Sequence, residues 1–189
     1  GVGIDHVDVA ACRARGIEVV HTPNANTQAV VEYVVTALAS SLRPLFALDE
    51  SLARDDWKAI RDARRAERQM SEMTLGVLGL GRIGRRVAEV AAAIGFDVQF
   101  NDLVTIPASA THGARSVGLE TLFSTSDALT IHIDGRPSNR RFVDAGLLDR
   151  MPSDVLFVNT SRGSVVDAAA LAVFLGRNPA ARAILDVHD

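Results

Sequence analysis

Thr74–Asp102 reads TLGVLGLGRIGRRVAEVAAAIGFDVQFND, and this stretch decides the fold. It opens with a short apolar run, Leu75 to Leu78, whose length and composition predict a buried strand. A G-x-G-x-x-G follows at residues 79–84. The next residues have a helical pattern that Gly95 should end as a C-cap. The apolar face of this helix would carry Ile83, Val87, Val90, Ala91 and Ile94. A second strand is predicted at Phe96–Phe100, just before Asp102.

The glycine motif predicts a dinucleotide-binding turn. Gly79 permits a tight turn from strand to helix, Gly81 lets the backbone approach a pyrophosphate, and Gly84 lets the helix pack closely on the strand. Asp102, 18 residues after Gly84, is placed to accept hydrogen bonds from ribose hydroxyls. The same glycine pattern also occurs in plain tight turns of α/β cores. Here the strand before it, the helix after it and the acid at this distance favour a dinucleotide.

Composition narrows the class of protein. A chain of 189 residues suits one well-buried domain, or one domain with part of another. The net charge of -3 does not suggest a nucleic acid or an anionic membrane as partner. A single cysteine, Cys12, excludes an internal disulfide, fits a reducing, cytoplasmic location and makes a cysteine-based metal site unexpected. We see neither a membrane-spanning run nor a secretory signal. Because the chain begins at Gly1 without a methionine, we expect it to be a fragment.

Strands and helices alternate along the rest of the chain. Before residue 74 we expect a helix at Val7–Arg15, a strand at Ile17–Val20 and a long helix that Pro44 ends after Arg43. The long helix should bury Val30, Val31, Val34, Val35, Leu38 and Leu42. After Asp102 the predicted elements are a helix at Leu119–Ser124, a strand at Ala128–Ile133, a helix from Asp144, a strand at Val155–Val158, a helix from Asp167 to Gly176 and a strand at Ala183–Val187.

This order predicts an α/β fold, a Rossmann-type doubly wound parallel sheet with part of a second domain. Ligands bind at the carboxyl ends of such strands. One rim should therefore hold Asn101–Asp102, His132–Ile133, Asn159–Gly163 and Asp186. Residues 45–72 are strongly charged with both signs, which usually means a solvated helical face. The alternative is an arm that Trp57 and Leu52 anchor to a neighbour.

The chain resembles the D-isomer-specific 2-hydroxyacid dehydrogenases, in register along essentially its whole length. The matching motifs are GVGIDHVD at 1–8, NTQAVVE at 26–32, GLGRIG at 79–84, SDALTIHI at 126–133, VNTSRGSVVD at 158–167 and LDV at 185–187. The resemblance implies an NAD-dependent oxidoreductase that moves a hydride between nicotinamide and a small 2-hydroxy or 2-keto acid. The arm at residues 45–72 favours a homodimer in the full-length form. Residues 1–43 would be a remnant of the substrate domain with an interdomain helix, 44–72 a charged arm, and 73–189 an NAD-binding domain incomplete at its C-terminus.

The resemblance also assigns roles to residues. Arg162 would hold the substrate carboxylate and carbonyl, for which a guanidinium offers a permanently charged bidentate fork. Taken alone, an arginine at a strand end would more simply form a surface ion pair. On the substrate side the resemblance adds Val2, Gly3 and Asn26. On the cofactor side it implies Thr27, Gly79, Gly81, Arg82, Ile83, Gly84, Asp102, His132, Ile133, Thr160, Ser161 and Asp186.

The family's proton donor, a histidine paired with a glutamate, lies beyond the LDV strand and therefore past Asp189. His188 follows that strand closely but is interpreted as a spacer, so we expect the chain alone to bind cofactor without catalysis. Three positions depart from the family pattern, namely Asn101, Asp134 and Arg140. The alternative function is a non-catalytic dinucleotide-sensing or partner-binding protein on the same scaffold.

Overall fold

The computed structural model describes residues 3–4, 7–45, 47, 51–63 and 65–189. Its centre is a sheet of six parallel strands in the order β3-β2-β1-β4-β5-β6. The strands are β1 (Thr74–Leu78), β2 (Asp97–Asn101), β3 (Arg115–Ser116), β4 (Ala128–Ile131), β5 (Leu156–Asn159) and β6 (Arg182–Leu185). Strand order reverses between β1 and β4, and open α/β sheets bind ligands at such a switch point. The predicted doubly wound parallel sheet is confirmed.

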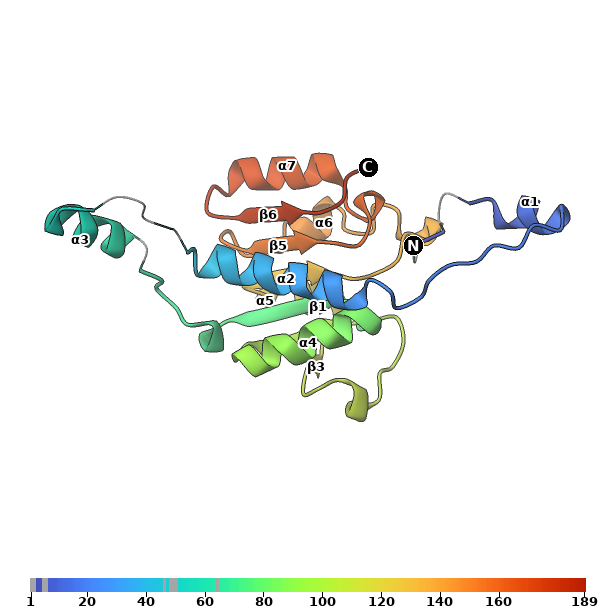
Figure 1. The fold of residues 1–189 in the computed structure, drawn as a ribbon, viewed down its shortest axis with the longest axis horizontal. Helices are drawn as coiled ribbons and strands as arrows, with labels where there is room; N and C mark the ends of the chain where they lie inside the picture. Colours follow the sequence, from blue (N-terminus) through green and yellow to red (C-terminus); the bar gives the residue numbers. More distant parts are fainter. Residues whose placement is uncertain (1–2, 5–6, 46, 48–50, 64) are drawn as a thin grey trace.

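Helices cover both faces of the sheet (Figure 1). One face carries α2 (Thr27–Leu42) and α4 (Arg82–Ile94), and the other carries α5 (Leu119–Thr125), α6 (Ala145–Leu148) and α7 (Ala168–Arg177). Capping residues mark the ends and starts of these helices where the sequence predicted them. Gly95 caps α4 in the left-handed conformation with φ 117°, and Asp167 accepts a hydrogen bond from the Ala170 amide at the start of α7. Short 3-10 turns lie at η1 (Met70–Glu72), η2 (Ala108–Ala110), η3 (Pro137–Asn139) and η4 (Gly163–Val165).

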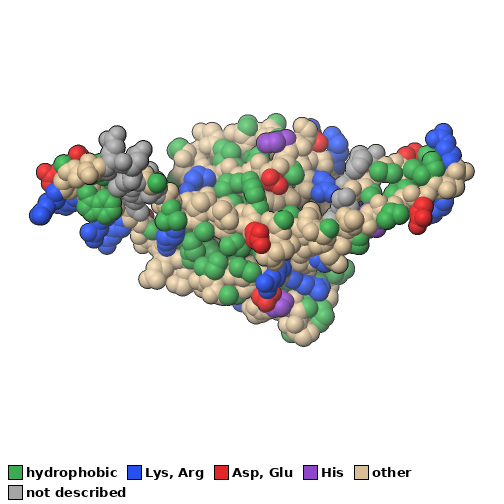
Figure 2. Space-filling view, in the orientation of Figure 1, with side chains coloured by type: hydrophobic (Ala, Val, Ile, Leu, Met, Phe, Trp, Pro, Cys, Tyr) green, Lys and Arg blue, Asp and Glu red, His purple; other side chains and the backbone are tan. Residues whose placement is uncertain are grey.

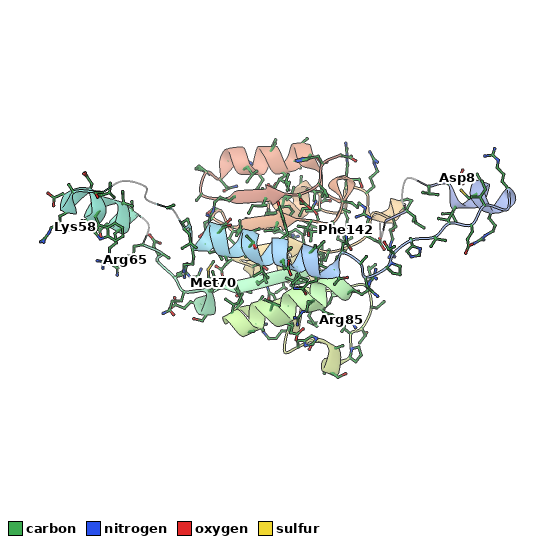
Figure 3. All side chains as sticks on the ribbon, in the orientation of Figure 1. Asp8, Lys58, Arg65, Met70, Arg85 and Phe142 are labelled. Carbon is green, nitrogen blue, oxygen red and sulfur yellow. The ribbon has the colours of Figure 1, made fainter. Side chains whose placement is uncertain are left out.

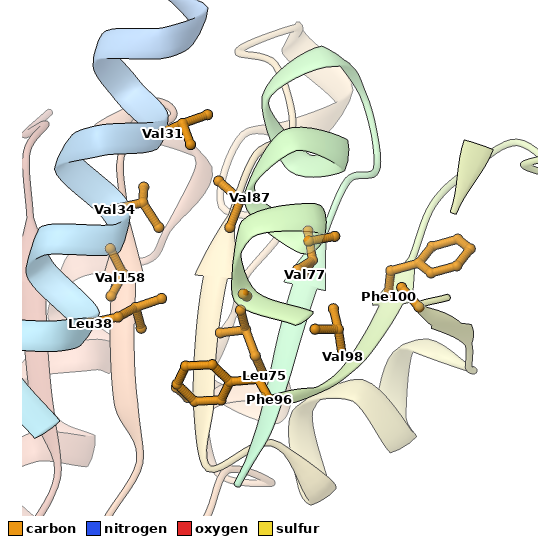
Figure 4. Close-up of a cluster of buried hydrophobic side chains, with 14 of the residues drawn as sticks. Val31, Val34, Leu38, Leu75, Val77, Val87, Phe96, Val98, Phe100 and Val158 are labelled. Atoms are coloured by element: carbon orange, nitrogen blue, oxygen red, sulfur yellow. The ribbon is translucent and has the colours of Figure 1, made fainter. Parts of the chain in front are cut away.

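The core beneath α2 and α4 holds the glycine turn in place. Figure 4 shows valines of α2 and α4 directed toward the sheet, over Leu75 and Val77 of β1. Val34 and Val87, from the two helices, are both fully buried. Each such side chain contributes about 1.5–3 kcal/mol relative to its exposed state. Of the residues predicted on the apolar face of α4, Ile94 is the least buried, at 44% exposed.

The strand predicted at Ile17–Val20 is wrong. These residues form no regular structure, and Ile17 and Val20 are 55% and 78% exposed. A strand needs a neighbour for its backbone hydrogen bonds, and none pairs with this segment in the described part of the chain. The helix before it, α1 (Val9–Ala14), is shorter than predicted because Asp8 caps it.

Residues 51–63 leave the body of the molecule. Figures 1 and 3 show α3 (Arg54–Ala63) extended away from the sheet, with Lys58 far from the core, while α1 projects in the opposite direction. Neither helix has a buried residue. The base of this arm is tied down, because Arg43 Nη2 donates to the Arg68 carbonyl at 2.5 Å and Arg68 pairs with Asp127 at 2.5 Å.

Candidate functional site

A cleft of about 420 Å³ opens at the carboxyl ends of the central strands. It is lined by Gly3, Asn26, Thr27, Val30, Gly79, Gly81, Arg82, Ile83, Asp102, Leu103, His132, Ile133, Asp134, Arg136, Asn139, Thr160, Ser161 and Arg162. Most of the residues that the sequence assigned to a site therefore lie together. Gly84 and Asp186 do not line the cleft, and Val2 lies outside the described residues.

The glycines of the turn have different surroundings. Gly79 has φ +91°, a conformation that side chains rarely adopt. A Cβ on Gly84 would lie 2.0 Å from the Gly79 carbonyl oxygen, so the helix packs on the turn at its closest approach. A Cβ on Gly81 would meet nothing within 4 Å. Because Gly81 also lines the cleft, that open space is available to a ligand.

Two helix N-termini meet at this cleft. Gly81 is the N-cap of α4 and Asn26 the N-cap of α2, and neither makes a side-chain capping bond. The first N–H groups of a helix have no intrahelical acceptor and carry partial positive charge. Three arginines, at positions 82, 136 and 162, line the same cleft. The arrangement suits an anionic ligand such as a pyrophosphate.

Asp102 is held at the end of β2 by the turn itself. Its Oδ2 accepts from the Leu80 amide at 2.6 Å and its Oδ1 from the Val104 amide at 3.1 Å. A carboxylate has about four acceptor positions, so hydroxyl donors can still bind to it. This placement fits ribose recognition.

His132 forms a neutral part of the wall. Its Nε2 lies 3.0 Å from the Thr130 hydroxyl, and burial lowers the pKa of His132 to about 4. The ring is therefore uncharged near pH 7 and is no source of protons there. His132 lines the cleft, and its role as a border of the cofactor stays a prediction.

Thr160 carries a polar atom without a protein partner. Its Oγ1 is buried and makes no hydrogen bond within the described part of the chain, although the residue lines the cleft. An unpaired buried hydroxyl costs about 1–3 kcal/mol. A ligand that hydrogen-bonds at this point would remove that cost.

Arg162 lies at the opposite side of the cleft from Asp102, after β5. It is half-buried, and its Nη1 donates to the Ser161 carbonyl at 2.8 Å. Gly135 makes room for it, because a Cβ there would lie 2.9 Å from Arg162 Cγ.

Sequence reasoning missed a polar group in the loop after β4. Arg136 Nε donates to Asp134 Oδ1 at 2.6 Å, and the Asn139 amide donates to the same oxygen at 3.0 Å. The bond from Arg136 lowers the pKa of Asp134. The departure at Asp134 was visible in the sequence, but its partners were not, since nothing local marks Arg136 or Asn139. Leu103 and Val30 were missed as well.

The described residues hold neither a metal-binding cluster nor a membrane-spanning helix. Among the described residues, no three His, Cys, Asp or Glu side chains gather as metal ligands would. No helix in the described ranges combines the length and the apolarity that crossing a membrane requires.

A parallel sheet whose switch point carries a glycine turn, a cradle of helix N-termini and an acid at the end of β2 defines a dinucleotide-binding domain. The chain belongs to the D-isomer specific 2-hydroxyacid dehydrogenases, because the profile of that family's NAD binding domain matches residues 35–189. The cofactor is accordingly NAD, and the cleft fits it: Gly81 leaves space, the helix starts offer N–H groups and Thr160 offers an unpaired hydroxyl.

Individual relatives agree with this assignment. The chain is 36% identical over 173 residues to the D-3-phosphoglycerate dehydrogenase of Mycobacterium bovis, covering 91% of this chain and 32% of that protein. It is 34% identical over 194 residues to the erythronate-4-phosphate dehydrogenase of Salinibacter ruber, covering 100% and 44%. A D-lactate dehydrogenase of Aquifex aeolicus, solved with NAD and lactic acid, superposes with a TM-score of 0.82 at 27% identity, covering 100% of this chain and 56% of that one. The chain thus spans between 32% and 56% of the length of these relatives.

Proposed function

We propose that the protein carrying this domain is an NAD-dependent oxidoreductase that interconverts a D-2-hydroxy acid and its 2-keto acid. The observation that carries the proposal is the placement of Arg162 in the same cleft as the glycine turn and Asp102. A cation at one end and a dinucleotide cradle along the rest suit a small carboxylate beside a nicotinamide. NAD supplies the hydride acceptor, and its reduced form the donor.

Each of the site residues then has its own role in binding. Asp102 binds the ribose hydroxyls, and the N-terminus of α4 binds the pyrophosphate. Thr160 and Ser161 border the nicotinamide with His132 and Ile133. Arg162 binds the carboxylate and orients the carbonyl, which a planar fork does better than a point charge.

Other predicted residues complete this proposal. Gly3 and Asn26 line the cleft, which is consistent with the substrate side. Asp186 follows β6 at the same edge, where it would accept from the carboxamide once the cofactor is bound. The domain division at residues 43 and 72 stays a prediction. The part before residue 44 nevertheless contributes Val31 and Val34 to the core.

The experiment compares the 1–189 chain with the full-length protein. We expect the chain to bind NADH, measured by nicotinamide fluorescence, but not to oxidise it with glyoxylate, hydroxypyruvate or pyruvate. Positioned acid catalysis is worth about 10²–10⁴ in rate, and His188 is exposed and does not line the cleft. The full-length protein should oxidise NADH with at least one of these acids. Tight NADH binding without turnover on any keto acid would favour the alternative, a dinucleotide sensor.

We also propose a cytoplasmic homodimer assembled through the arm. Leu45, Leu52 and Trp57 are 96%, 37% and 47% exposed. A shallow apolar groove between α2 and α4 would receive the arm of a second copy, and Figure 2 shows apolar side chains gathered there. Its lining is Val35, Leu38, Ala39, Met70, Ala91, Ile94 and Phe96. Phe46 and Leu48, also expected to contribute, lie outside the described residues.

A further inference from the structure

We propose that Asn159 is a positioning residue that sets the conformation of the Arg162 loop, an inference that rests on the proposed function of Arg162. Asn159 is the last residue of β5 and is only 1% exposed. It lies at the carboxyl edge of the sheet, between β4 and β6, in register with Ile131 of β4 and Leu185 of β6. Its side chain does not line the cleft. Any effect on a ligand must therefore act through another residue.

Both ends of the Asn159 amide hold the loop that follows. Oδ1 accepts from the Ser161 amide at 3.0 Å and from the Ser161 hydroxyl at 2.8 Å. Nδ2 donates to the Arg162 carbonyl at 3.0 Å. The side chain thus bonds to main-chain groups on both sides of the Ser161–Arg162 peptide and fixes its orientation.

That peptide in turn directs the guanidinium. Arg162 Nη1 donates to the Ser161 carbonyl at 2.8 Å. The guanidinium is therefore bonded to the peptide group that Asn159 orients. The loop is confined on its far side as well, because a Cβ on Gly163 would lie 2.1 Å from the backbone carbon of His188. The Asn159 carbonyl also accepts from the Asp186 amide at 3.0 Å, which joins the end of β6 to the same point.

Only an amide side chain of this length supplies both an acceptor for Ser161 and a donor for the Arg162 carbonyl. Aspartate keeps the acceptor for Ser161 but turns a second oxygen toward the Arg162 carbonyl. That contact is repulsive unless the carboxyl is protonated, and burial favours protonation. Alanine removes both bonds. These differences allow positioning to be separated from ordinary core stability.

The test uses the full-length protein with Asn159→Ala, Asn159→Asp and a matched control, Gln99→Ala. Gln99 is also buried, at 2% exposed, and its amide bonds to Thr125 and Ser126 outside the cleft. We expect Asn159→Ala to lower kcat/KM for the keto acid about 100-fold, the effect of a displacement of about 1 Å. Binding of ADP-ribose, which is the cofactor without its nicotinamide ring, should stay within about twofold. Gln99→Ala should lower Tm and leave both readouts unchanged.

The aspartate variant supplies a pH signature that a structural role would not produce. At pH 8 it should match Asn159→Ala, and by pH 6 it should recover about tenfold relative to wild type, as its carboxyl becomes a donor. A kcat/KM within threefold of wild type in Asn159→Ala would overturn the inference. So would equal losses of ADP-ribose binding and turnover, or an aspartate variant whose activity ratio is flat with pH.

A second measurement separates this inference from the proposed function. If no 2-keto acid supports NADH oxidation by the wild-type protein, the proposed function fails. Amide hydrogen exchange in the 1–189 chain then tests whether Asn159 holds the loop. Asn159→Ala should then raise the exchange rate of the Ser161 amide at least tenfold, while Gln99→Ala should not. An unchanged Ser161 rate would show that Asn159 does not hold the loop.

Discussion

Gly84→Ala should lower stability and Gly81→Ala should weaken cofactor binding, because the two glycines of the turn lack a side chain for different reasons. At Gly84 an added Cβ would lie 2.0 Å from the Gly79 carbonyl oxygen, where about 3.5 Å is comfortable. The opposing atom is backbone and cannot rotate away. The helix α4 must therefore shift by an amount on the order of 1 Å, which disturbs the packing of Val87 and Ala88 beneath it.

The expected magnitude follows from two opposing terms. Overpacking a buried contact costs about 1–3 kcal/mol, and a rigid backbone partner places Gly84→Ala at the upper end. Alanine favours a helix over glycine by about 1 kcal/mol, which offsets part of this cost. We expect a net loss of about 2 kcal/mol in the free energy of unfolding. For a chain of this size, that lowers Tm by roughly 4–8 °C.

The assay follows thermal and urea unfolding by circular dichroism, together with NADH binding by fluorescence. Gly81→Ala is the matched control, since its Cβ would meet no protein atom within 4 Å and its φ of -73° suits alanine. That variant should unfold like wild type but bind NADH at least tenfold more weakly, because its methyl group occupies ligand space. A Gly84→Ala variant as stable as wild type, or a Gly81→Ala variant with normal affinity, would refute the assignment of the two roles.

Other predictions concern the ligands, the arm and the wall of the cleft. NAD should bind more tightly than NADP, because Asp102 repels a 2′-phosphate and the next residues, Leu103 and Val104, supply no cation; equal affinities in a fluorescence titration would contradict this. In the full-length protein Arg162→Lys should keep cofactor binding and lose roughly 10²–10⁴ in kcat/KM, whereas a variant within threefold of wild type would make Arg162 a surface residue. Trp57→Glu should shift sedimentation toward monomer, and an unchanged oligomer would show that the arm is not needed. Because the pKa of His132 falls from 6.5 to about 4 on folding, the unfolded chain binds the proton first, and the free energy of unfolding should drop by up to about 3 kcal/mol as pH falls through that window. His132→Gln should remove this part of the pH dependence, measured by urea unfolding between pH 4 and pH 8.

The sequence predicted the β1–α4–β2 unit almost residue by residue because its signals are local. A glycine at a turn, a glycine at a helix end and an apolar period act within a few residues. Gly79 and Gly95 both adopt positive φ, as those positions require. The strand predicted at Ile17–Val20 had the right residues but no neighbour to pair with, and pairing is a non-local property. The short strand β3 was missed for the opposite reason, since Arg115–Ser116 pairs with β2 without a strand-like sequence.

The same distinction applies within the site. Residues carried by a motif, such as Asp102 and Arg162, could be placed at the cleft from the sequence, because strand ends meet at one edge of a parallel sheet. The bonds that orient them could not. Asp102 is held by the Leu80 amide, 22 positions away, and the Asp134–Arg136 pair enters the cleft only because the loop after β4 folds back beside Arg162. The presence of a functional residue in the cleft can be predicted where a suitable residue type follows a strand. The orientation of the Arg162 guanidinium depends instead on contacts such as those of Asn159, which no local sequence pattern reveals.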